Sequence, residues 1–256
     1  QKKEDLNQCF EGVDTVVHLA ALKSVNGSMQ FPQKYSENNI TGTLSVLETM
    51  HENNVKHIIF SSTAAVYGEP EYLPLDEKHP LKPVNFYGYT KLSAENLLEW
   101  YKELMGISYI SLRYFNAAGY DASGRIKYLE KNPQNLIPII MEVAAGKREK
   151  VDVFGDDYDT PDGTGIRDYI HVSDLVKAHL NALELIQTNQ SALINLGSDQ
   201  QYSVMDVIKI AEKISGKDIP YKIVERRKGD PAKIYASTAY AKKILNWSAE
   251  HSSLEN

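Results

Sequence analysis

Cysteine is almost absent from this sequence, since Cys9 is the only one in 256 residues. A single cysteine can form neither an internal disulfide nor a cysteine-based zinc site, so we propose no metal site and expect a reducing compartment, the cytoplasm. Long hydrophobic runs are also missing: stretches such as 57–60 and 136–140 are far shorter than the ~20 residues of a membrane helix. The opening residues contain no apolar signal-peptide core. We therefore expect neither a membrane protein nor a secreted one.

Positive charge is in short supply as well. Lys and Arg number 28 against 34 Asp and Glu, which gives a formal net charge of −6 at pH 7. Proteins that bind nucleic acids or anionic membranes need a basic surface. We therefore expect no nucleic-acid and no membrane partner, and any phosphate site in this chain must be local.

The rest of the composition is that of a folded protein. Hydrophobic residues make up 42% and charged residues 24%, with no low-complexity tract and no visible repeat. Short apolar runs alternate with amphipathic stretches along the first part of the chain. Strands are expected at 14–21, 57–62 and 107–113, and helices at 35–53 and from Tyr87 onward. This alternation predicts an α/β fold with a Rossmann-like, doubly wound parallel sheet.

Two regions are expected within this length. Residues 1–115 carry the strand and helix alternation, and residues 116–256 have longer loops and a turn-rich segment at 155–165. The second region is predicted to be smaller and to cover a cleft, with about 168–190 packing back on the first region. Ligands of open α/β sheets bind beyond the carboxyl ends of the strands, so the cleft is expected beside 20–21, 61–63 and 115–116.

A hydroxyl, a phenol and an ammonium group are predicted to meet at this cleft. Thr63 ends a strand, whereas Tyr87 and Lys91 stand four residues apart on a helix and so share one face. A nearby ammonium favours the phenolate and lowers the pKa of the tyrosine, which suits a general base. With 16 tyrosines in the chain, such a spacing is expected about once by chance. From the spacing alone, a half-buried tyrosine beside a solvated lysine remains the alternative.

Seven blocks in order resemble the extended short-chain dehydrogenase/reductase family and, within it, the UDP-glucose (UDP-galactose) 4-epimerases. They include His18-Leu19-Ala20-Ala21-Leu22-Lys23 and Leu112-Arg113-Tyr114-Phe115-Asn116. The full set is 18–23, 38–43, 60–68, 87–91, 112–116, 162–172 and 226–230.

The resemblance implies an NAD-dependent epimerisation at C4 of a UDP-hexose through a 4-keto intermediate. It implies that Tyr87 removes the 4-hydroxyl proton, that Thr63 relays the proton or holds the oxygen, and that Lys91 lowers the phenol pKa and bonds the nicotinamide ribose. It also implies a homodimer formed through the helices at 35–53 and from Tyr87. The cofactor-binding residues implied are Leu19, Ala20, Ala21, Leu22, Lys23, Asn38, Thr63, Tyr87, Lys91 and Phe115.

The resemblance also implies a UDP-sugar site. The guanidinium groups of Arg167 and Arg227 can bond a diphosphate, Phe154 offers a face to uracil, and Asp230 can accept hydrogen bonds from a ribose. Taken singly, Phe154 is better explained as a core aromatic and Asp230 as a turn residue, and the arginines could be members of surface ion pairs. The substrate-binding residues implied are Asn116, Asn135, Leu136, Phe154, Arg167, Arg227, Asp230 and Ile234.

Two positions narrow the reaction within the family. Related dehydratases and decarboxylating enzymes carry an acid one or two residues after the strand-end Ser/Thr, where this chain has Ala64 and Ala65. Elimination then lacks a proton-transfer group, which favours simple epimerisation. Ile234 stands where the family limits hexose size, and its modest volume predicts room for an N-acetylated sugar.

The Gly-x-x-Gly-x-x-Gly turn that begins the family's fold does not occur in these residues. We expect a fragment; the alternatives are strands supplied by another polypeptide or a shortened relative that lost NAD. A non-catalytic sugar-nucleotide binding protein therefore remains an alternative function. So does an epimerase or reductase that acts on another nucleotide sugar.

Overall fold

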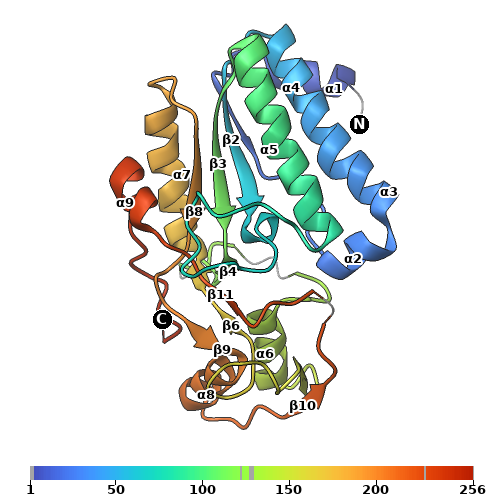
Figure 1. Cartoon of the computed structure of the whole chain (residues 1–256), viewed down its shortest axis with the longest axis vertical. Coiled ribbons are helices and arrows are strands. Elements are labelled where there is room, and N and C mark those ends of the chain that lie inside the picture. The colour runs from blue at the N-terminus through green and yellow to red at the C-terminus, as the bar shows by residue number, and fades with distance from the viewer. Residues whose placement is uncertain (1–2, 122, 127–129, 228, 256) are drawn as a thin grey trace.

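A four-stranded parallel sheet forms the centre of the larger part of the molecule (Figure 1). The computed structural model describes residues 3–121, 123–126, 130–227 and 229–255, and the side chains from residue 6 onward within these ranges. The strand order is β1-β2-β3-β8, and each neighbouring pair is parallel. The strands are β1 (Thr15–His18), β2 (His57–Thr63), β3 (Ser108–Tyr114) and β8 (Ala192–Leu196).

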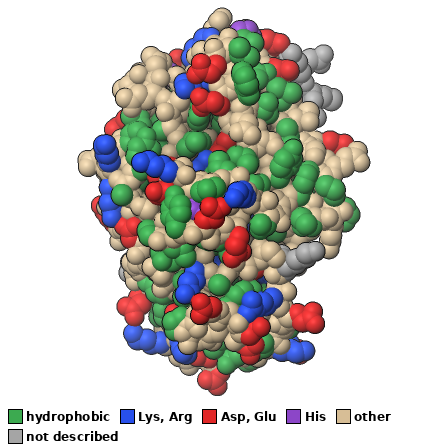
Figure 2. Space-filling model, in the orientation of Figure 1, with side chains coloured by type: hydrophobic (Ala, Val, Ile, Leu, Met, Phe, Trp, Pro, Cys, Tyr) green, Lys and Arg blue, Asp and Glu red, His purple; other side chains and the backbone are tan. Residues whose placement is uncertain are grey.

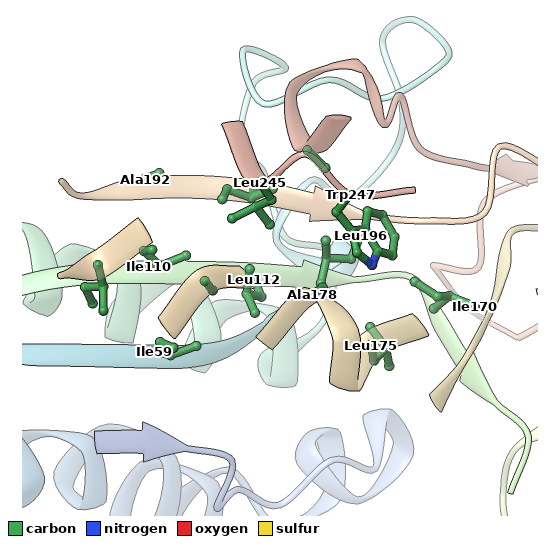
Figure 3. Close-up of a cluster of buried hydrophobic side chains, with 14 residues drawn as sticks. Ile59, Ile110, Leu112, Ile170, Leu175, Ala178, Ala192, Leu196, Leu245 and Trp247 are labelled. Carbon is green, nitrogen blue, oxygen red and sulfur yellow. The ribbon is translucent and has the colours of Figure 1, made fainter. Parts of the chain in front are cut away.

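Helices cover both faces of this sheet because successive residues of β2 point to opposite sides. Ile58 and Phe60 are buried in one core together with Leu98, whereas Ile59 belongs to the other core with Trp247. Figure 3 shows the second core, in which Leu112 and Ala178 also lie. The first core is covered by α1 (Lys3–Cys9), α4 (Gly42–Glu52) and α5 (Phe86–Met105), and the second by α7 (Val172–Ile186) and α9 (Ala239–Leu245).

The smaller part of the molecule lies beyond the carboxyl ends of the sheet strands (Figure 1). Its core joins the apolar faces of α6 (Leu136–Ala144) and α8 (Val204–Ser215). Short strand pairs complete it: β5 (Val151–Phe154) with β10 (Tyr221–Val224), β6 (Ile166–Arg167) with β9 (Tyr202–Ser203) and β11 (Lys233–Ile234), and β4 (Asn116–Ala118) with β7 (Tyr169–His171).

The start of α5 is fixed by its cap and by a close approach to the sheet. The Asn85 side chain accepts a hydrogen bond from the Gly88 amide at 2.9 Å, which makes Asn85 the N-cap. A Cβ atom on Gly88 would lie 2.4 Å from the Ala65 carbonyl oxygen in η2 (Ala64–Val66), the turn that follows β2. The first turn of α5 therefore rests directly on the chain that leaves β2.

The parallel α/β sheet predicted from the sequence is confirmed, with shifts at the ends of elements. The strand expected at 57–62 runs one residue further, and that expected at 107–113 is displaced by one residue. The strand expected at 14–21 is shorter, and the helix expected at 35–53 comprises the end of α3 (Pro32–Tyr35), a π-helical turn η1 (Ser36–Thr41) and α4. The loop after β1 leads into α2 (Val25–Gln30).

Charged side chains are spread over the surface rather than collected by sign. Figure 2 shows basic and acidic groups interspersed on the face that it presents. Within the part of the chain that the structure describes, no helix combines the length and apolarity that crossing a bilayer requires.

Candidate active site

The end of β2 and the start of α5 bring Thr63 and Tyr87 together. Thr63 is the last residue of β2, and Tyr87 is the second residue of α5. The Thr63 side chain lies close enough to the Tyr87 phenol to favour its ionised form, and the Thr63 Oγ1 accepts a hydrogen bond from the Ala65 amide at 3.2 Å. A strand end and a helix start thus place a hydroxyl beside a phenol, as the sequence predicts.

The Tyr87 phenol holds its proton more tightly than a free tyrosine does. Burial raises its pKa to about 12, and the nearby Thr63 side chain only partly opposes this effect. This direction is opposite to the one expected from the Tyr87 and Lys91 spacing. Loss of hydration is the larger effect in the protein without cofactor, so Tyr87 is a neutral phenol at pH 7.

Lys91 is buried and directed toward β2. Its side chain is 2% exposed, and its Nζ donates to the Ser61 carbonyl oxygen at 2.7 Å and lies 4.7 Å from the centre of the Phe60 ring. Burial lowers the pKa of Lys91 to about 8, and the negative charge of Glu95 partly opposes this. Burial first and the Lys91 charge second lower the pKa of His18 to about 4. The lysine is therefore part of the interior, which rules out the solvated lysine of the alternative interpretation.

The loop after β1 is held by an asparagine that the sequence did not single out. Asn39 accepts a hydrogen bond from the Leu22 amide at 2.8 Å, and its own amide donates to the Leu22 carbonyl and to Thr90 at 3.0 Å each. Its neighbour Asn38, the expected cofactor contact, is exposed. The two adjacent asparagines could have pointed to this role of Asn39. Neighbouring residues of a helix point in different directions, so only one of the two can face the loop.

The same edge of the sheet presents groups that suit a dinucleotide. Leu19 is 59% exposed although it is apolar, and Lys23 is an exposed cation that pairs with Glu130 at 2.9 Å. An apolar side chain can cover a ring, and an ammonium can bond a phosphate. Of the other predicted cofactor residues, Ala20 is exposed, Ala21 is half-buried and Phe115 is buried. The residues present fit NAD.

Four of the predicted substrate residues meet in two pairs. Arg167 forms an ion pair with Asp230, and the Arg227 guanidinium lies 3.8 Å from the centre of the Phe154 ring. Burial and then the charge of Arg167 lower the pKa of Arg227, so the two guanidinium groups lie within electrostatic range. These side chains therefore form one local cationic site in an acidic protein.

The remaining substrate residues lie on flanking elements. Ile234 is paired with Arg167 across β11 and β6. Asn116 begins β4, and its amide donates to the Asp168 carbonyl at 2.9 Å. Asn135 is the N-cap residue of α6, and Leu136 is the first residue of that helix. Among the described residues, no hydrogen bond joins Asn135 or Leu136 to the two arginine pairs, although α6 contacts β5, the strand that ends at Phe154.

Comparison with known proteins places this arrangement in a family. Residues 1–197 match the NAD dependent epimerase/dehydratase family. The chain belongs to this family.

Its relatives include UDP-glucose 4-epimerases of several organisms. A UDP-glucose 4-epimerase of Halalkalibacterium halodurans is 48% identical over 95% of this chain and 73% of its own length. The structure of a UDP-glucose 4-epimerase from Brucella ovis in complex with NAD matches at a TM-score of 0.95 and 39% identity, over 99% of this chain and 79% of that one. A third UDP-glucose 4-epimerase, from Bifidobacterium longum in complex with NAD+ and UDP, matches at a TM-score of 0.94 and 42% identity. This match covers 99% of the present chain and 77% of that one.

Proposed function

We propose that this chain catalyses the reversible epimerisation of a UDP-hexose at C4, with NAD as cofactor and a transient 4-keto sugar as intermediate. The observation that carries the proposal is the Thr63 and Tyr87 contact beside buried Lys91 at the carboxyl edge of a parallel sheet. UDP-glucose and UDP-galactose are the substrate pair, as the names of the relatives support.

Leu19 to Lys23 and Asn38 would hold NAD along the carboxyl edge of β1, and Phe115 would hold it beside β3. Bound NAD supplies the acceptor for the C4 hydride and a positive charge near the phenol. That charge favours the phenolate and opposes the burial that raises the pKa of Tyr87.

Tyr87 takes the proton from the 4-hydroxyl of the sugar and later returns it. Thr63 donates to or accepts from the same oxygen, because its hydroxyl already lies beside the phenol. Lys91 cannot move freely while its Nζ bonds the Ser61 carbonyl, so it acts as a fixed charge one helical turn from Tyr87. General base catalysis of this kind contributes about 10²- to 10⁴-fold to a rate.

The nucleotide is bound by the two arginine pairs. A diphosphate is a stronger partner for Arg167 and Arg227 than their present neighbours, since phosphate oxygens accept several charge-assisted hydrogen bonds. Asp230, released from Arg167, can accept hydrogen bonds from the ribose, and Phe154 offers its ring to the uracil.

The reaction is limited to epimerisation by the alanines after Thr63. Ala64 is buried in η2 and Ala65 is half-buried, so neither position offers a proton donor near C5 or C6. Ile234 pairs with Arg167 across β11 and β6 and is smaller than an aromatic side chain, so we propose UDP-N-acetylglucosamine as a further substrate. Turnover of UDP-glucose without any turnover of the N-acetylated sugar would refute this extension.

Two copies of the chain associate through α4 and α5. Trp100 and Leu104 are 65% and 68% exposed on α5, and Tyr89 lies on the same helical face. Exposed apolar groups repeated along one helix are typical of a protein interface.

The test of the proposed function is release of the cofactor. The full-length protein is denatured and the supernatant is analysed by chromatography, together with a turnover assay on UDP-galactose. Released NAD(H) and turnover are expected. Binding of UDP-sugar without NAD(H) would instead identify the non-catalytic binding protein, and turnover of other nucleotide sugars alone would identify the second alternative.

A further inference from the structure

Three consecutive residues of β2 are each held by α5. The Ser61 carbonyl accepts from Lys91, the Ser62 hydroxyl donates to Glu95 at 2.6 Å, and the Thr63 side chain lies close to the Tyr87 phenol. The partners lie on three successive turns of α5. The relative position of Thr63 and Tyr87 is therefore linked to what happens at Glu95, two turns from the phenol.

Glu95 is itself fixed by a buried arginine on β3. Arg113 donates from Nε to one carboxylate oxygen at 2.9 Å and from Nη2 to the other at 2.7 Å, and the two side chains are 0% and 3% exposed. Arg113 also donates to the Tyr67 hydroxyl at 2.9 Å, which donates to Asn195 of β8 at 2.6 Å. This network ties α5 to three strands of the sheet.

Stability alone is a poor reason for this ion pair. Burying two charges costs hydration free energy that the pair only partly regains, and hydrophobic replacements of similar volume are often neutral or stabilising. The Glu95 carboxylate also faces Lys91 across one helical turn of α5. The other titratable groups around Lys91 are His18 of β1 and the neutral Tyr87 of α5.

We propose that Glu95, held by Arg113, is a positioning residue for the reaction: it fixes the end of β2 against α5 and supplies the buried negative charge that faces Lys91. The inference rests on the proposed function. Without this charge the Lys91 ammonium faces only burial and loses its proton at lower pH, because Glu95 is the group that raises its pKa. The neutral amine of Lys91 donates only a weaker hydrogen bond to Ser61 and no longer carries a charge that favours the phenolate.

The test is Glu95→Gln in the full-length, NAD-loaded protein. The amide keeps an acceptor for Ser62 but removes the charge. We expect kcat to fall about tenfold or more with an unchanged KM for the UDP-sugar, and the alkaline limb of the kcat profile to move to lower pH. The ionisation of Lys91 can be followed without turnover by NMR of isotope-labelled lysine, with the signal assigned by Lys91→Met. Its midpoint is expected to move to lower pH as well.

Glu99→Gln is the matched control. Glu99 lies one turn further along α5, where its carboxylate accepts from Tyr109 and from Lys102 rather than from β2. Its pH profile is expected to match that of the unaltered protein. If neither the unaltered protein nor the Glu99→Gln variant had epimerase activity, the proposed function would be wrong. Activity in these two proteins with an unaltered Glu95→Gln profile would instead overturn the inference alone.

A second variant keeps the test decisive if Glu95→Gln folds poorly. Glu95→Gln leaves Arg113 buried without a counter-charge, whereas Glu95→Gln combined with Arg113→Met removes both charges. We expect the double variant to regain thermal stability while its alkaline limb and its Lys91 ionisation stay displaced. An unaltered pH profile and Lys91 titration in a folded variant of either kind would overturn the inference.

Discussion

Tyr87 has conflicting requirements. Burial beside Thr63 makes the phenol hold its proton, with a pKa raised to about 12, yet a base must be ionised when the sugar is bound. In the proposed mechanism the positive charge of bound NAD would resolve this conflict, because it would act in a poorly hydrated site where charges interact strongly.

Replacing Tyr87 tests this assignment. In the full-length protein, Tyr87→Phe is expected to lower turnover of UDP-galactose by about 10²- to 10⁴-fold, since the proton acceptor is lost. Affinity for UDP, measured by calorimetry, is expected to stay unchanged because the arginine pairs lie on other elements. Turnover close to that of the unaltered protein would remove Tyr87 from the mechanism.

His18 predicts a dependence of stability on pH. Burial and the Lys91 charge hold its folded-state pKa at about 4, whereas the unfolded chain has the ordinary value of 6.5. The unfolded state therefore binds more protons between these values, so the contribution to stability is complete above about pH 6.5 and is lost as the pH falls toward 4. The difference corresponds to about 3 kcal/mol.

Calorimetric melting at several pH values measures this effect. His18→Gln is expected to melt at a temperature that falls less between pH 7 and pH 4.5 than that of the unaltered protein. The amide can still donate to Thr43, as the His18 ring does at 3.1 Å. Identical pH dependence in both proteins would contradict the assignment.

At the scale of elements, the position of α5 depends on how closely its first turn approaches β2. Gly88→Ala would place a methyl group 2.4 Å from the Ala65 carbonyl, so the helix must shift. We expect a loss of about 1–3 kcal/mol in unfolding free energy and a fall in kcat, because Tyr87 moves with the helix.

Urea denaturation and steady-state kinetics check this expectation. Glu103→Ala is the control, since Glu103 is exposed on α5 and its pair with Lys102 at 3.5 Å contributes little. A Gly88→Ala protein with unaltered stability and turnover would show that the close approach of Gly88 to Ala65 does not determine the position of α5.

The elements differ in how far the sequence predicted them. The run at 57–60 and the apolar spacing of α5 are local patterns, and both predictions are confirmed. Strand β8 was not expected, because its pairing with β3 joins segments about 80 residues apart and leaves no local signal. The Glu95 and Arg113 pair was missed for the same reason. The roles of the site residues stay predictions, since each role is defined by a contact with the cofactor or with the UDP-sugar.

At the scale of the whole molecule, we predict that Trp100→Glu weakens the proposed dimer. The added charge would face apolar groups of a second copy across α5, which raises the dissociation constant. Sedimentation velocity over a range of protein concentrations measures it. Val176→Glu, at an exposed apolar position of α7 on the other face of the sheet, is the control and should leave the assembly unchanged. Equal dissociation constants for both variants would exclude this interface.

The distant origin of β8 also has a consequence for synthesis. Thr63, Tyr87 and Lys91 leave the ribosome early, but β3 has no neighbour on its second side until residues 192–196 have been made. Until then the apolar face that later packs on α7 and β8 is open to other chains. Closing so long a loop is slow, so the nascent chain should depend on chaperones that shield this edge, and its yield on expression should fall when they are depleted.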